Sequence, residues 1–235
     1  MHTLGIVHRQ QGRYDEAADH SQQALHLYHE LRDPLGKAMQ LEGLGGVYAR
    51  QGHFPTTIAH LERALRLDRE IGNRPGEADA LTELGLVHLR QGRHVAAVEH
   101  YRRAIGLYRQ TGSRSGESVA LNGLGETSHA AGHVDEARRQ HTAALALAPQ
   151  TGDEYEQARV HTGLARVHDA CGVADLAHHH WQEAARLAAG LDVPLAEEFG
   201  GRGDPGRLDR LPGPEAAHAA VDDARGRVRR NGDHR

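Results

Sequence analysis

The feature that most limits how this chain can fold is a phrase of ten residues that returns every 40 residues. It reads TLGIVHRQQG at 3–12, GLGGVYARQG at 43–52, ELGLVHLRQG at 83–92, GLGETSHAAG at 123–132 and GLARVHDACG at 163–172. A repeat of this kind is one supersecondary unit, and it must stack on its neighbours to bury its apolar face. The chain is therefore expected to form a linear array of five repeats.

Each repeat contains two apolar stretches with helical spacing. In the third repeat, Leu81, Leu84 and Val87 share one helical face, and Tyr101 and Tyr108 lie on the face of a second helix. A glycine follows each first helix, where a left-handed C-cap residue belongs. The residues placed to cap the next helix are Asp33, Asn73, Ser113 and Asp153, with Pro34 and Pro75 in the tolerant first turn.

The columns of the repeat resemble the tetratricopeptide repeat, in which W-x2-L-G-x2-Y is followed by A-x3-F, then A, then P. The matching residues are Leu44, Gly45 and Tyr48; Leu84, Gly85, Ala97, Tyr101 and Ala104; Pro149; and Leu164, Ala177, Trp181 and Ala184. The repeat is 40 residues long instead of about 34, and in this respect it resembles the repeats of arrays in actinobacterial regulators and kinesin light chains. The resemblance implies an all-α fold: an α-solenoid of five stacked helix-turn-helix repeats forming a right-handed superhelix.

The array is expected to occupy residues 1–190, followed by a flexible tail over 191–235. A sixth repeat would place its Leu-Gly pair at 204–205, where the chain has Asp-Pro. Prolines and glycines are dense after residue 190, as in flexible segments, and one short helix is predicted at 214–225. The final ARGRVRRNGDHR has five arginines, which could contact nucleic acid, but a solvated, disordered terminus is the favoured interpretation.

The first repeat begins inside its first helix. In the second repeat this helix is expected to start near Pro34, about seven residues before the residue that matches Met1. Solenoids normally end in a polar cap, and Leu4, Ile6 and Val7 provide none. We therefore expect either that the chain is the C-terminal part of a longer array or regulator, or that its first hairpin pairs with another molecule, including a second copy.

Composition argues against several classes of protein. The single cysteine, Cys171, excludes an intrachain disulfide, and no apolar run approaches the ~20 residues of a membrane span. The net charge of −4 does not favour a nucleic-acid or membrane partner for the whole chain. The N-terminus lacks the pattern of a secretory signal, so a cytoplasmic location is expected.

Twenty histidines raise the question of a metal site, and their spacing argues against one. Members of one column are 40 residues apart, or about 10 Å in a stack, whereas zinc holds its nitrogen ligands at ~2 Å. The consecutive His178, His179 and His180 point about 100° apart on a helix. The two histidine columns are His8, His88 and His168, which share the aromatic slot of the repeat with Tyr48, and His20, His60, His100 and His180. We expect the first column to be packing residues, and we expect no metal and no cofactor.

The sequence carries no recognisable catalytic motif. It has no phosphate-binding loop, no nucleophile elbow and no paired-cysteine zinc motif. A zinc- or thiol-dependent enzyme that uses Cys171 or the histidine-rich fifth repeat is the least favoured interpretation. The chain is therefore expected not to be an enzyme.

The resemblance places ligands on the inner, concave face of the first helices. The clamp by which chaperone-type arrays hold a peptide carboxylate is absent, and several arginines favour an acidic or C-terminal partner segment. The leading interpretation is a scaffold that binds a protein or peptide; the alternative is the sensor arm of a bacterial transcription regulator. The residues expected to line the groove are Glu42, Arg50, Asp79, Thr82, Arg90, Asn122, Glu126, Arg159, Thr162, Arg166 and Asp169.

Overall fold

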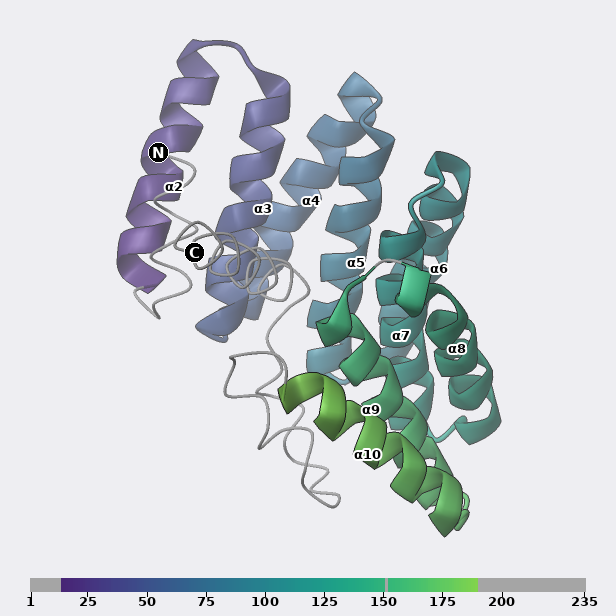
Figure 1. Ribbon diagram of the computed structural model, residues 1–235. Coiled ribbons are helices and arrows are strands. Elements are labelled where there is room, and N and C mark those ends of the chain that lie inside the picture. The colour runs from purple at the N-terminus through teal and green to yellow at the C-terminus, as the bar shows by residue number, and fades with distance from the viewer. Residues whose placement is uncertain (1–13, 151, 190–235) are drawn as a thin grey trace, which may run out of the picture. The chain divides into compact units, whose positions relative to one another are not determined.

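The computed structural model describes residues 14–150 and 152–189, and every described element is helical (Figure 1). This confirms the all-α solenoid class that the repeat predicts. The predictions for residues 1–13 and for the tail, including the short helix at 214–225, lie outside the described residues. None of the described helices is long and apolar enough to cross a membrane.

The chain divides into two compact units, with the boundary between Gly112 and Ser113. In the first unit, each helix packs on the next one along the chain, and the first helices α3 and α5 also touch each other. The helices of this unit are α2 (Tyr14–Glu30), α3 (Pro34–Arg50), α4 (Phe54–Ile71), α5 (Arg74–Arg90) and α6 (His94–Thr111).

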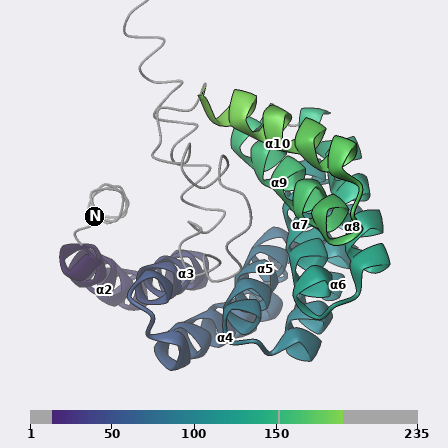
Figure 2. The same ribbon diagram turned by 90° about the horizontal axis from the view of Figure 1, so that it is seen from below.

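The second unit repeats this arrangement. Helix α7 packs on α8 and on α9, and α9 packs on α10, which runs beside it in both views (Figures 1 and 2). The elements are α7 (Arg114–Ala130), α8 (Val134–Leu147), a short 3-10 helix (Ala148–Gln150), α9 (Glu154–Ala170) and α10 (Ala174–Ala189).

The predicted caps are all present. The side chain of Asp33 accepts a hydrogen bond from the Gly36 backbone N–H at 3.0 Å, and that of Asp153 accepts one from Glu156 at 2.9 Å. Asn73 and Ser113 cap α5 and α7 in the same way. The glycines that follow the first helices have the left-handed φ that ends a helix without a Cβ penalty, at Gly52 (75°), Gly92 (69°), Gly132 (80°) and Gly172 (72°).

A second glycine column makes room for large side chains of the partner helix. A Cβ at Gly85 would lie 2.9 Å from the buried ring of Tyr101, and one at Gly45 would lie 2.9 Å from Leu61. The column is therefore small because a side chain lies flat on the helix, rather than because two backbones cross. In these two hairpins the packing places a large side chain of the second helix over the first helix.

Replacing Gly85 with alanine should reduce the free energy of unfolding by about 1–3 kcal/mol, because the added Cβ displaces the Tyr101 ring. Gly106 is the matched control: it lies inside α6 with nothing within 4 Å of an added Cβ. Gly106→Ala should stabilise the protein by up to about 1 kcal/mol through helix propensity. Urea unfolding of both variants checks this prediction: the free energy of unfolding should fall for Gly85→Ala and rise for Gly106→Ala.

Candidate functional site

The structure separates the eleven predicted groove residues by burial. Two are exposed, Asp79 and Asp169, and five are half-buried, namely Glu42, Arg50, Arg90, Glu126 and Arg166. The other four, Thr82, Asn122, Arg159 and Thr162, are buried. These four side chains therefore do not form part of an accessible surface, and their interactions are internal.

Three of the predicted residues meet in a buried polar network of the second unit. The guanidinium of Arg159 on α9 donates to Glu126 of α7 at 2.8 Å and to Glu156 of α9 at 3.1 Å. Nδ1 of His141 on α8 lies 2.8 Å from Oδ1 of Asn122, to which it donates. The network ties α7, α8 and α9 together, and its charges are directed at one another rather than at solvent.

Burial controls protonation in this network. Burial raises the pKa of Glu156 to about 7, against the opposing effect of the Arg159 charge. Burial also lowers the pKa of His141 to about 4, so this imidazole is neutral at physiological pH. One arginine faces two carboxylates, so protonation of Glu156 reduces the uncompensated negative charge in the interior.

Two further groove residues meet in the first unit, again around a buried side chain. The hydroxyl of Tyr108 on α6 donates to Oδ1 of Asp79 at 2.6 Å and lies 3.2 Å from Oγ1 of Thr82. Burial, followed by the Asp79 charge, raises the pKa of Tyr108, which stays protonated as a donor. These contacts join α5 to α6, and they direct one oxygen of Asp79 towards the protein.

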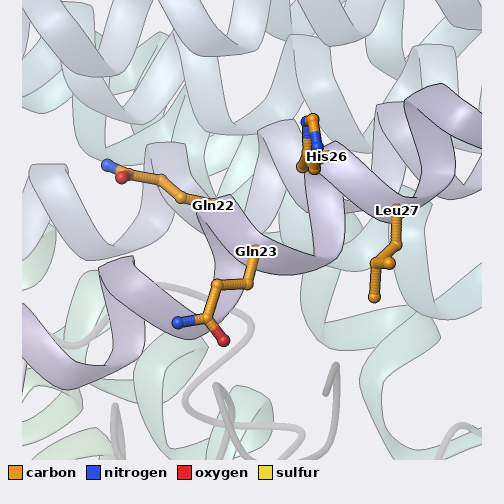
Figure 3. Close-up of a pocket in the computed structure, with 4 residues that line it drawn as sticks. All are labelled: Gln22, Gln23, His26 and Leu27. Atoms are coloured by element: carbon orange, nitrogen blue, oxygen red, sulfur yellow. The ribbon is translucent and has the colours of Figure 1, made fainter.

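An exposed group of apolar side chains flanks the turn between α2 and α3. Its members, the apolar patch, are Leu27 (44% exposed), Leu31 (73%), Leu35 (46%) and Met39 (44%). Leu27 also lines an open pocket on α2 together with Gln22, Gln23 and His26 (Figure 3). None of these four residues is among the eleven that the sequence predicts for the groove.

Three of the four columns of the patch hold a buried apolar side chain in at least one other repeat. Leu107, which occupies the column of Leu27, is buried, and so is Leu187. Tyr155 in the column of Leu35 and Val119 in the column of Met39 are buried as well. An apolar side chain at these three positions can therefore be buried by its neighbours, whereas Leu27, Leu35 and Met39 are at the surface of the described structure.

The two histidine columns meet in three of the described hairpins, α3–α4, α5–α6 and α9–α10, which sequence reasoning missed. Rings 12 residues apart face each other across the inter-helix turn: Tyr48 and His60 with centroids 5.3 Å apart, His88 and His100 at 5.1 Å, and His168 and His180 at 5.4 Å. The antiparallel hairpin and its fixed turn length were the signal that could have revealed this pairing. Within 14–150 and 152–189, no group of three or more histidine, cysteine or acidic side chains is arranged to hold a metal ion.

Comparison with known families now identifies the repeat. A tetratricopeptide-repeat family model matches residues 37–110, and a second one matches residues 1–33. The chain is a tetratricopeptide-repeat protein. A search of curated protein sequences finds no significant match to this tetratricopeptide-repeat chain.

Solved structures show the same fold at low sequence identity. BtubC (BKLC) from P. vanneervenii is 22% identical with a TM-score of 0.69, over 87% of this chain and 82% of that one. A Rap protein complexed with Competence and Sporulation Factor is 17% identical with a TM-score of 0.73, over 99% and 69%. A kinesin light chain repeat protein from Podospora anserina is 18% identical with a TM-score of 0.64, over 80% and 92%. At these identities the likeness establishes the fold alone.

Proposed function

We propose that this tetratricopeptide-repeat protein is a non-catalytic scaffold that binds a protein or peptide segment. The observation that carries the proposal is the apolar patch of Leu27, Leu31, Leu35 and Met39, which is exposed although three of its four columns hold a buried apolar side chain elsewhere in the chain. Exposed apolar groups that cluster on a soluble surface commonly mark interaction sites. The similar Rap protein was solved with a bound factor, which supports a binding role for this architecture.

The surroundings of the patch favour a partner segment with apolar and acidic side chains. Arg32 is exposed in the turn that separates Leu31 from Leu35, and Lys37 lies on the first turn of α3. Opposite charges on a partner would orient the segment and speed its association, while its apolar side chains supply the buried area. Among the groove residues, Arg50 of α3 is half-buried on the same helix as Met39 and extends the site in this proposal.

A matched pair of variants tests the proposal. Peptides that bind the purified chain would first be selected by display. Their affinities for the patch variant Leu31→Glu/Met39→Glu and for the control variant Val95→Glu would then be measured by fluorescence anisotropy. Val95 is 86% exposed on α6 of the same unit but lies outside the patch. We expect the patch variant to weaken binding at least about tenfold and the control to leave it unchanged, because carboxylates do not enter an apolar contact. Equal affinities for both variants, with unchanged circular dichroism, would refute the site.

A further inference from the structure

Three half-buried imidazoles, those of His161, His168 and His180, gather between the two helices of the last described hairpin, and the exposed His179 lies beside them. His161 and His168 lie on α9, and His179 and His180 lie on α10. Nδ1 of His161 is 3.0 Å from Nδ1 of His180, within hydrogen-bond distance. The rings of His168 and His180 stack with an interplanar angle of 11°, and the His179 ring centroid lies 5.2 Å from that of His180.

The contact between His161 and His180 requires one of its two facing nitrogens to be unprotonated. In a neutral imidazole one nitrogen donates and the other accepts, but in an imidazolium both nitrogens carry a proton. If both rings are charged, two N–H groups point at each other over 3.0 Å, and the hydrogen bond is replaced by repulsion. Full protonation of the pair therefore removes a hydrogen bond that joins α9 to α10.

The neighbouring charges offer little compensation for added protons. Arg138 on α8 acts on His168, and Arg186 on α10 acts on His161; both are positive. Glu183 on α10 attracts His161 and His180, but its carboxylate already accepts a hydrogen bond from Arg186 at 2.9 Å. Asp169 on α9 accepts from the indole N–H of Trp181 at 3.0 Å. Protonation of this cluster would thus place several positive charges together at the α9–α10 contact.

The repeat shows that His161 is a departure from the pattern. Its column holds leucine in the three preceding repeats, at Leu41, Leu81 and Leu121, and all three side chains are buried. His161 is half-buried in this position, and its charged form is disfavoured there because an ionised group that loses hydration without a partner is costly to bury. In the first unit, the rings of His88 and His100 stack as those of His168 and His180 do. The described contacts show no third ring hydrogen-bonded to that pair, as His161 is to His180.

We propose that α9–α10 is an acid-sensitive hairpin, in which protonation of the His161–His168–His180 cluster releases α10 from α9. Release would expose Ala184 and Leu187 of α10 and their counterparts on α9, such as Leu164, which are buried in the closed hairpin. Acidification would thereby create a new apolar surface at one position in the array, while the remaining hairpins stay folded.

The expected pH range follows from the electrostatics of the cluster. Burial, and then the neighbouring histidines, lowers the pKa of His180 from 6.5 to about 4, and burial also lowers the pKa of His161 and His168. Well above pH 6.5 the His180 ring is neutral in both the closed and the open state, so its protonation does not affect the free energy of closing the hairpin. Between 6.5 and about 4 the open state takes up protons that the closed state excludes, so closure weakens as the pH falls.

The chain contains its own probe for this transition. Trp181 is its single tryptophan, it lies on α10, and its indole is bonded to Asp169 of α9. We expect its emission maximum to move to longer wavelength with a midpoint between pH 6.5 and 4, and amides 174–189 to lose protection, corrected for intrinsic exchange, over the same range. Amides of α5 and α6 should remain protected throughout it.

Variants borrowed from the other repeats provide the decisive comparison. His161→Leu/His168→Tyr places in the last repeat the residues found at Leu81 and Tyr48, and it should lower the midpoint by about one pH unit or more. His88→Tyr makes the same exchange in α5 and should leave the Trp181 transition unchanged. His180→Gln, which carries the residue of Gln140, should also lower the midpoint and replaces the double variant if that one does not fold.

Three results would overturn the proposal. The first is protection of residues 174–189 that persists in the original chain down to pH 4. The second is a midpoint that is the same in the original chain and in the cluster variants. The third is loss of protection in α5 and α6 at the same pH as in α10, which would indicate general acid unfolding.

Discussion

Replacing Arg159 with methionine is expected to reduce the free energy of unfolding of the second unit by about 3–5 kcal/mol. The guanidinium is buried and contacts both Glu126 and Glu156, so its removal leaves two carboxylates in the interior without a cation. Methionine fills a similar volume, which makes the loss mainly electrostatic. Urea denaturation at pH 7, with the m-value monitored, measures the change.

An exposed arginine of the same unit provides the control. Arg138 pairs with Asp135 at 3.1 Å, and both side chains are largely exposed, so Arg138→Met should cost no more than about 1 kcal/mol. Glu126→Gln/Glu156→Gln added to Arg159→Met should recover much of the loss, because no buried charge then remains. If the two single arginine variants lose equal stability, the buried network does not hold α7 and α9 together.

The regular part of the structure was predictable because it repeats. Five copies of one pattern indicated the helices, the capping side chains and the left-handed glycines. The caps and the glycines follow from backbone geometry that every copy must satisfy. Asp33 and Gly52 could be assigned from a single repeat, since each has a local reason for its place. The domain boundary at 190 and the groove as a binding surface remain predictions.

The candidate sites were harder to predict because they arise where one repeat departs from the others. Glu156 stands in a column that holds glycine at Gly36, Gly76 and Gly116, and His161 stands in a leucine column. Comparing equivalent positions of the repeats shows what the repeats have in common, so this comparison assigned Asn122 and Arg159 to one shared surface. Their burial depends on neighbours such as Glu156 that no other repeat has. Contacts across the hairpin, such as those of the paired histidines, also required both helices to be considered together.

Truncating Tyr101 to alanine is expected to lower the free energy of unfolding of the first unit by about 3–5 kcal/mol, the usual cost of removing a buried aromatic ring. Tyr101 is among the largest fully buried side chains of the described residues, and its ring covers Gly85. Tyr101→Leu, which introduces the residue that Leu61 provides in the preceding repeat, should cost clearly less, because more of the volume is retained. Thermal and urea unfolding of both variants measure the difference.

Combining Tyr101→Ala with Gly85→Ala tests whether ring and glycine act as one contact. Gly85→Ala alone is harmful because its Cβ would lie 2.9 Å from the Tyr101 ring, so without the ring the same Cβ should enter vacated space. The double variant should therefore lose less stability than the sum of the single variants, by about 0.5–3 kcal/mol. Additivity within about 0.5 kcal/mol would mean that the two positions are independent. The glycine column would then need another cause, such as helix-to-helix backbone distance, even though a ring or leucine faces it in the α3–α4 and α5–α6 hairpins.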